Sequence, residues 1–225
     1  LASTGGSTFI KQPDDSFLVG GANPAKDIYD ISTHTFGTNL TAVRLEALTH
    51  ASLPAGGPGR HSNSNFVLSE IELTATSILQ PTLKKKIRFS RAIGDYSQVN
   101  YEVSKAIDGT VAGNNGWAVD GPTRKANATA LLIAEEPFGF RGGTELKFRL
   151  RHEASFATHG IGRPRLSITS DPVTAIDFRG IPVEIIQITK TPNNKQTIEQ
   201  KDQVLKYFLQ HHDPRQIIRE RISAI

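Results

Sequence analysis

The stretch Thr144-Glu145-Leu146-Lys147-Phe148-Arg149-Leu150-Arg151-His152 alternates apolar and charged side chains more clearly than any other part of the chain. Successive side chains of a β-strand point to opposite faces of the sheet, and an antiparallel sheet commonly buries only one of them. The stretch therefore predicts a half-buried strand, with Leu146, Phe148 and Leu150 facing a hydrophobic core and the charged residues facing solvent.

Shorter segments with apolar residues at alternate positions lie on both sides of this strand. Turn-forming residues, as in Pro13-Asp14-Asp15 and Gly20-Gly21-Ala22-Asn23-Pro24, separate the first of them. No helical pattern intervenes before residue 171, so we predict a mainly β protein built as an antiparallel β-sandwich. The expected strands lie in segments 8–10, 16–19, 28–31, 41–48, 66–73, 86–90, 128–134, 144–152 and 165–169.

Three neighbouring segments bear on a possible site. Segment 50–65 is rich in Pro, Gly and Ser and is expected to be a long functional or disordered loop. In segment 66–73, alternation places Glu70 on one face with Phe66 and Leu68, where a carboxylate must be paired, protonated or bound to a metal. The run Lys84-Lys85-Lys86 is interpreted as a solvated connection before the next strand.

The character of the sequence changes at Asp171-Pro172. Apolar residues then recur at helical spacing in segments 181–189, 197–209 and 213–222. Helix-start signals accompany them, namely Pro182, Asp213-Pro214, and a capping box formed by Thr197 and Gln200. We therefore predict two parts, a β-sandwich over residues 1–170 and a short α-helical C-terminal extension over residues 171–225.

Composition limits the classes of function. The chain has no Cys, which excludes disulfides, thiol catalysis, zinc-thiolate sites and c-type haem attachment within it. Its net charge is only +4, and its basic residues accompany no nucleic-acid-binding motif. No apolar run is long enough to span a membrane, and the absence of Met, even at position 1, indicates an excised domain or processed fragment.

Residues Lys105–Gly121 contain the only tryptophan, Trp117, in a segment dense in Gly, Asn and Asp. Gly tolerates positive φ, and Asn and Asp hydrogen-bond to their own backbone, so the segment is predicted to be a loop. Its apolar residues Ala106, Ile107, Trp117 and Val119 bracket a polar middle. We expect them to pin both ends of the loop to the core, leaving an oxygen-rich rim suited to calcium or a sugar.

Within this loop, Ala106-Ile107-Asp108-Gly109 followed by Gly116-Trp117 resembles the A-x-D-G…W signature of discoidin-type, galactose-binding-like domains, which include many carbohydrate-binding modules. Together with further motifs, it resembles a domain of the large secreted planctomycete proteins that also carry a planctomycete-type cytochrome c domain. The resemblance implies a galactose-binding-like jelly roll, an extracytoplasmic location (periplasmic, cell-surface or secreted), and other domains of the parent polypeptide as partners. The further motifs are 45–48, 57–60, 65–70 and 159–163.

Discoidin-like modules commonly hold a calcium ion beneath their binding loops, with ligands from the Asp-Gly loop and from a strand glutamate. The resemblance implies these roles for Asp108, Thr110 and Glu70, although the glutamate strand here precedes the Asp-Gly loop instead of following it. Oxygen ligands in a chain without cysteine suit Ca²⁺ better than zinc or copper. The alternative is a salt-bridged Glu70 and an Asp108 that caps a turn.

A sugar site needs aromatic faces beside planar hydrogen-bonding groups, because sugars offer both C–H faces and hydroxyls. Trp117 could supply such a face, but it has an alternative interpretation as a core residue. Since the aromatic groups are few, we expect weak glycan binding at most. The loop residues of suitable type are Arg60, Tyr96, Tyr101, Asn114, Asn115, Trp117, His159 and Arg163.

The sequence thus predicts a non-catalytic carbohydrate-binding-like module of a larger secreted protein, with calcium as its cofactor and a polysaccharide or other glycan as its partner. A scaffold that joins parts of that protein is the second interpretation and requires none of these residues to be chemical. A glycan-active hydrolase is the third, yet its candidate acids Glu102, Glu135, Glu136 and Glu153 show no pairing pattern.

Overall fold

We describe residues 1–172 and 183–211 in a computed structural model of the chain. The chain divides into two compact units, Leu1–Val173 and Thr174–Ile225. The first contains all strands of the described residues, and the second contains the described α-helices. No helix in these two ranges is long and apolar enough to cross a membrane.

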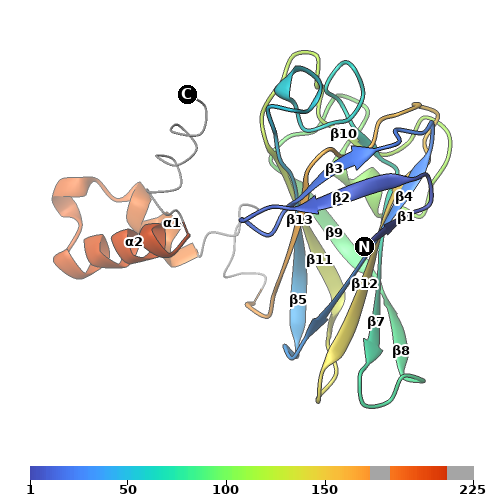
Figure 1. The fold of residues 1–225 in the computed structure, drawn as a ribbon. Helices are drawn as coiled ribbons and strands as arrows, with labels where there is room; N and C mark the ends of the chain where they lie inside the picture. Colours follow the sequence, from blue (N-terminus) through green and yellow to red (C-terminus); the bar gives the residue numbers. More distant parts are fainter. Residues whose placement is uncertain (173–182, 212–225) are drawn as a thin grey trace. The chain divides into compact units, whose positions relative to one another are not determined.

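The first unit is an antiparallel β-sandwich, as the sequence predicts (Figure 1). One layer has five strands in the order β1 (Ala2–Ser3), β4 (Asp27–Thr35), β12 (Thr144–His152), β7 (Glu70–Ser77) and β8 (Lys84–Ile87). The other has four, in the order β13 (Pro164–Thr169), β5 (Leu40–Ala47), β11 (Ala128–Phe138) and β9 (Phe89–Gly94). Two smaller antiparallel pairs are β2 (Ser7–Lys11) with β3 (Phe17–Gly21), and β6 (Val67–Leu68) with β10 (Trp117–Ala118).

The core lies between the two layers and follows the alternation of the sequence. Leu146, Phe148 and Leu150 of β12 are at most 1% exposed, as expected from their spacing. From the opposite layer, Val43 and Leu45 of β5 are fully buried. Each inward row therefore removes several large aliphatic groups from water, which is the main source of stability in such a fold.

The prediction that Glu70 shares a face with Phe66 and Leu68 is wrong, because the alternation of inward and outward side chains shifts by one residue at Ser69. Phe66 and Leu68 face the core before this point, and Ile71 and Leu73 face it afterwards. Ser69 lies between β6 and β7, where its N–H and its hydroxyl both donate to the Arg151 carbonyl oxygen, at 2.8 Å each. The irregularity removes Glu70 from the row of Phe66 and Leu68 and begins a new ladder with β12.

The strand expected at residues 86–90 is two strands in different layers. β8 ends at Ile87 and β9 begins at Phe89, so the chain crosses from one layer to the other at Arg88. Lys84, Lys85 and Lys86 are exposed as predicted, but they belong to β8 instead of a connection. β8 is the last strand of its layer, and lysines on an edge strand oppose pairing with another molecule.

The β2–β3 hairpin joins the two layers (Figure 1). On one side, Ser7 of β2 donates to the carboxylate of Asp27 in β4, and the Arg60 guanidinium donates to the Ser7 hydroxyl at 2.7 Å. On the other side, Arg163 and Arg165 contact the Asp14 carboxylate in the hairpin turn, at 2.9 and 3.4 Å. The hairpin therefore closes one side of the sandwich through buried and half-buried polar contacts.

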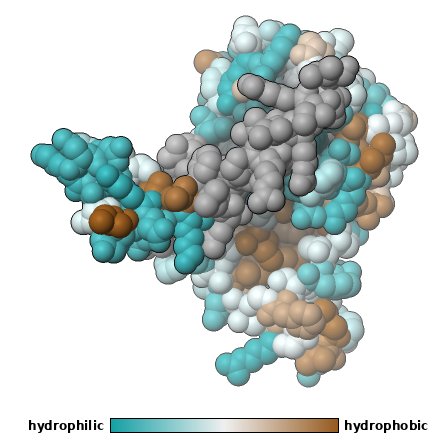
Figure 2. Space-filling view, turned by 60° about the vertical axis from the view of Figure 1, so that its left-hand side comes forward, coloured by the Kyte–Doolittle hydropathy of each residue, from teal (hydrophilic) through white to brown (hydrophobic). Residues whose placement is uncertain are grey.

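Hydrophobic side chains are exposed at the end of the sandwich where the β4–β5 and β7–β8 turns lie. Figure 2 shows such side chains at the lower end of the sandwich. Phe36 is 82% exposed and Leu79 is 71% exposed, and a Cβ at Gly143 would contact both Phe36 and Ile78. The turns therefore bring apolar groups of different hairpins together.

The second unit contains α1 (Val183–Lys190), a 3₁₀ turn at Asn193–Lys195, and α2 (Ile198–His211). The expected capping box is present, because the Thr197 N–H donates to Gln200 Oε1 at 3.0 Å and the Gln200 N–H donates to Thr197 Oγ1 at 3.2 Å. The helix start expected at Pro182 and the helix expected at 213–222 with its cap at Asp213 lie outside the described residues.

Candidate functional site

The loop predicted at Lys105–Gly121 lies at the end of the sandwich that carries β10, at the top of Figure 1. It is pinned at both ends, as expected, since Ala106, Trp117 and Val119 are at most 1% exposed. The Trp117 indole N–H donates to the Tyr96 carbonyl oxygen at 3.0 Å, and its ring meets Phe66 edge-on. Trp117 is thus a core residue and offers no ring face to a ligand.

Neighbouring loops are fixed against this one by close backbone contacts. A Cβ at Gly121 would lie 2.2 Å from the Asn65 nitrogen, and one at Gly59 would lie 1.9 Å from the Asn65 carbonyl oxygen. Only glycine permits such approaches. The Ser155 N–H also donates to the Gly113 carbonyl oxygen at 2.8 Å. The expected long loop at 50–65 is therefore an ordered part of the site's frame.

Four oxygen atoms converge on a single point in the central loop. The Asn115 side-chain nitrogen lies 2.9 Å from the Thr110 carbonyl oxygen and 3.2 Å from that of Lys105. It also lies 3.2 and 3.3 Å from the two carboxylate oxygens of Asp108. Asp108 further accepts from the Thr110 N–H at 2.8 Å, the turn-capping bond of the alternative interpretation.

Glu70 reaches the same loop, although it comes from the strand that precedes it. Its carboxylate accepts from the Gly109 N–H at 3.0 Å, and the side chain is almost fully buried, with the residue 8% exposed. Burial raises the pKa of Glu70 to about 7, and the nearby negative charges of Asp108 and Glu72 act in the same direction. The Gly109 N–H and the positive charge of Lys86 lower this pKa, but they do not outweigh burial.

This donor set fits a hard cation. Carboxylate and carbonyl oxygens are the ligands that Ca²⁺ prefers, and the amide of Asn115 now stands where a positive charge would be stabilised. A cation there would require the Asn115 side chain to turn its oxygen inward or swing away. Among the described residues, no group of three His, Asp or Glu side chains could hold a metal, so the backbone carbonyls would have to contribute.

A small cavity opens beside this loop. Its volume is ≈ 150 Å³, and it brings together Tyr101 and His159 of the residues predicted for ligand binding. Phe156 lies between their rings, meeting Tyr101 edge-on with centroids 5.5 Å apart and His159 edge-on with centroids 5.9 Å apart. The remaining lining residues are Asn63, Asn65, Val67, Gln98 and Ala118.

The cavity has amide groups next to its aromatic rings. Asn65 is held in place, because its side-chain nitrogen donates to Gln98 Oε1 at 2.9 Å and its oxygen accepts from the Val119 N–H. For the amide nitrogens of Asn63 and Gln98, no hydrogen bond is found within the described ranges. Both can donate to a hydroxyl group placed in the cavity.

The imidazole ring of His159 forms one side of this cavity. The His159 ring stacks on His61 with centroids 3.9 Å apart, and its Nδ1 lies 2.7 Å from the Ala157 carbonyl oxygen. Burial lowers the pKa of His159, and the neighbouring His61 lowers it further. A neutral His159 donates from Nδ1 and leaves Nε2 as an acceptor.

Lys105 connects the converging oxygens to Tyr101 in the cavity wall. The Lys105 carbonyl oxygen is one of the four around Asn115, and the Lys105 ammonium lies 5.7 Å from the centre of the Tyr101 ring. A substitution in the cavity or around Asn115 can therefore affect the other site through Lys105.

The other residues predicted for ligand binding are placed elsewhere. Arg60 is 9% exposed and donates to the Gly20 and Gly21 carbonyl oxygens at 3.0 and 3.1 Å. Arg163 binds Asp14 and donates to Ser16 Oγ at 2.7 Å. The Tyr96 ring lies beneath the Arg124 guanidinium, and Asn114 is exposed in the central loop without lining the cavity.

Sequence reasoning missed Asn63, Gln98 and Phe156. Phe156 could have been found, because it is the one large apolar side chain in the polar segment 153–160. Three of the glycosidase candidates lie in ion pairs, Glu136 with Lys85, Glu153 with Arg151 and Glu102 with Lys105, and the fourth, Glu135, is exposed on β11.

Comparisons with protein-family models, with curated proteins and with solved structures each found no match to this chain. The resemblance to discoidin-like domains therefore rests on the residues quoted above, and the function is argued from the geometry of the loop end of the sandwich.

Proposed function

We propose that the chain is a non-catalytic carbohydrate-binding-like module, with the cavity beside Tyr101 as its glycan contact. The observation that carries the proposal is the grouping of Tyr101, Phe156 and His159 with the free amide donors of Asn63 and Gln98. Aromatic faces take the C–H surfaces of a sugar, and amides take its hydroxyls.

The size of the cavity limits the affinity. At ≈ 150 Å³ it is smaller than the pockets that enclose a whole small-molecule ligand, so it holds part of one sugar unit. Because little surface is buried, binding to a single site is expected to be weak. Repeated units of a polysaccharide, or several modules in one parent protein, would raise the overall avidity.

Calcium is proposed as the ion that fixes the loop frame, held by Asp108, by the Thr110 and Lys105 carbonyl oxygens and, nearby, by Glu70. This rests on the convergence of four oxygens around Asn115 and on the nearby buried carboxyl group of Glu70, whose pKa is raised by burial. In line with the sequence resemblance, we place the parent protein outside the cytoplasm and take its other domains as partners.

A glycan array tests the binding proposal directly. Tyr101→Ala and Phe156→Ala should each remove retention of any glycan that the chain retains, because they delete the aromatic walls. Asn114→Ala is the matched control and should retain it, since Asn114 lies outside the cavity. Retention that survives both aromatic substitutions would contradict the proposal, and release of reducing ends would favour the hydrolase.

Thermal unfolding with and without calcium tests the ion. A ligand bound only by the native state stabilises it in proportion to the logarithm of its excess over Kd, so chelation should lower Tm. Asp108→Ala should abolish the response, whereas Asp15→Ala removes the same charge from an exposed pair with Lys11 and should preserve it. Without a calcium response and without a retained glycan, the scaffold becomes the better interpretation.

A further inference from the structure

Three turns lie side by side at the end of the sandwich opposite to the cavity beside Tyr101 (Figure 1). Thr144, the first residue of β12, pairs with Thr35 of β4 on one side and with Ser77 of β7 on the other. The turns that follow β4 and β7 and the turn that precedes β12 therefore start from the same level of the sheet. They comprise residues 36–39, 78–83 and 139–143.

Large apolar side chains of these turns are exposed and lie close together. The turn 139–143 brings them together because it presents glycines to its neighbours. A Cβ at Gly142 would lie 2.3 Å from the Leu79 side chain, and one at Gly143 would lie 3.3 Å from that of Phe36. Soluble monomers rarely expose contiguous apolar groups without a binding role. We call this surface the apolar tip, and its members are Phe36, Ile78, Leu79 and Leu83.

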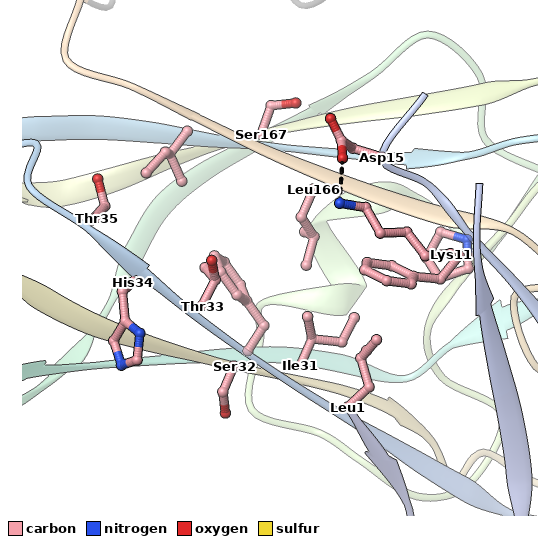
Figure 3. A pocket seen from close by; sticks show the side chains of 14 residues that line it. Leu1, Lys11, Asp15, Ile31, Ser32, Thr33, His34, Thr35, Leu166 and Ser167 are labelled. Atoms are coloured by element: carbon pink, nitrogen blue, oxygen red, sulfur yellow. Dashed lines mark ion pairs between the residues drawn. The ribbon is translucent and has the colours of Figure 1, made fainter. Parts of the chain in front are cut away.

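The apolar tip lies outside the cavities of the sandwich. The larger cavity, of ≈ 450 Å³, runs between β4 and β13, and Figure 3 shows Thr33 and Thr35 of β4 along it. Neither this cleft nor the cavity beside Tyr101 is lined by any side chain of the apolar tip. These side chains stand on turns that end the sandwich, and such a surface can enter a fluid layer without a matching pocket in a folded partner.

The charge of the three turns is positive. Arg141 is the only charged residue in them, and Lys84 directly follows the second turn. Both side chains are exposed, and neither makes an ion pair within the part of the chain that the structure describes. The next acidic residues along the chain, Glu136 and Glu145, lie on strands, and Glu136 pairs with Lys85 at 2.6 Å. The end of the sandwich therefore complements an anionic surface.

Backbone amides of the turns are satisfied within the protein. The Ile78 N–H donates to the Gly143 carbonyl oxygen at 3.1 Å, and the Gly143 N–H donates to that of Phe140 at 3.2 Å. The Leu83 N–H donates to the Gln80 carbonyl oxygen at 2.8 Å. A polar group without a partner resists transfer out of water, so these bonds lower the cost of placing the turns among lipid headgroups.

We propose that the apolar tip docks the protein on the surface of a phospholipid bilayer that carries anionic headgroups. The four apolar side chains enter the boundary between headgroups and acyl chains, and Arg141 and Lys84 contact the lipid phosphates. Binding combines the apolar area withdrawn from water with the attraction between opposite charges. The cavity beside Tyr101 lies at the other end of the sandwich, so this docking does not depend on glycan binding.

Cosedimentation of the full chain with vesicles tests the proposal. We expect binding to vesicles of phosphatidylcholine and phosphatidylglycerol in equal parts, and much weaker binding to phosphatidylcholine alone. Phe36→Ser and Leu79→Ser should each weaken binding to the anionic vesicles about tenfold, because each removes a large part of the inserted surface. Val99→Ser is the matched control and should bind normally, since Val99 is 80% exposed but follows Gln98 of the cavity at the other end.

Charge reversal tests the role of the basic side chains. Arg141→Glu and Lys84→Glu should each reduce the preference for anionic vesicles. Lys125→Glu makes the same change of charge at an exposed position between β10 and β11, at the loop end, and should keep the preference. Inorganic phosphate should release no more protein than chloride at the same ionic strength, because the bilayer and not a free phosphate is the ligand. Specific release by phosphate would overturn the proposal.

Phe36→Trp reports insertion directly, because Trp117 is buried at the other end and gives a constant background. Its emission should shift to the blue with anionic vesicles, whereas that of Val99→Trp should not. The proposal is overturned if the chain does not sediment with anionic vesicles, if Phe36→Ser binds them like the wild type, or if neutral vesicles bind equally well. A dimer that Leu79→Ser dissociates and that ignores vesicles would overturn it in favour of a second copy of the chain.

Discussion

The substitution Glu70→Gln should make the protein more stable at neutral and alkaline pH. The carboxyl group is almost buried and accepts one hydrogen bond, from the Gly109 N–H, which a glutamine oxygen can accept equally well. Glutamine keeps the shape of the side chain and removes its ionisation. The difference between the two proteins therefore isolates the cost of the buried charge.

The magnitude follows from the pKa of Glu70, which burial raises from 4.5 to about 7. Below pH 4.5 the group is protonated in both the folded and the unfolded state, and the wild type loses nothing. As the pH rises, the unfolded state ionises first, and the loss is complete above about pH 7. That interval corresponds to about 3 kcal/mol of folding free energy.

Urea unfolding of both proteins, without calcium, near pH 4.5 and above pH 7 measures this difference. All other titrating groups are common to both proteins and cancel. We expect nearly equal free energies of unfolding at the lower pH and a clear advantage for the glutamine variant at the higher one. If the variant gains nothing as the pH rises, Glu70 is ionised at its ordinary pKa and the reasoning is wrong.

Three further substitutions probe buried polar groups, each measured by urea unfolding. Arg60→Ala should cost about 3 kcal/mol, because it removes the buried partner of Ser7 and of two backbone carbonyls, and a cost near zero would contradict that role. Trp117→Phe should cost about 2 kcal/mol by leaving the Tyr96 carbonyl oxygen without its donor, yet any glycan retention should survive. Burial lowers the pKa of His152 from 6.5 to about 4, so the stability contributed by its neutral form is lost as the pH falls from 6.5 to about 4. His152→Phe should flatten the dependence of the unfolding free energy on pH in this range, and an unchanged slope would refute the reasoning.

The sequence predicted the strands that have one face on the core. In β12 and β5 the local alternation and the buried face agree, so the inward residues Leu146, Phe148 and Leu45 follow from spacing alone. The shift at Ser69 does not follow from spacing, because it depends on a hydrogen bond to the Arg151 carbonyl oxygen, 82 positions away. Local alternation carries no information about such a partner.

The candidate site shows the same division. The pinned, oxygen-rich loop around Asp108 was predicted because Gly, Asn and Asp act locally. The role of Arg60 was not predicted, since its partner Ser7 is 53 positions away. Arg60 is a buried structural group instead of a loop residue open to ligands. Likewise, Tyr101 and Phe156 meet only because separate loops are packed together at one end of the sandwich.

The pairing of the strands sets the order in which the chain can fold during synthesis. β4 pairs with β12, so that Asp30 meets Arg149, 119 positions later, and the hairpin contact of Asp14 with Arg163 spans 149 positions. Such distant pairings form slowly, because a long loop must close before any contact rewards it. On the ribosome, β5 therefore emerges with no strand to join until β11 has followed, and β4 has only the two-residue strand β1 as a partner until β12 has followed. A nascent chain paused before residue 128 exposes the apolar row of β5, and a chaperone that recognises extended apolar segments is expected to bind it there.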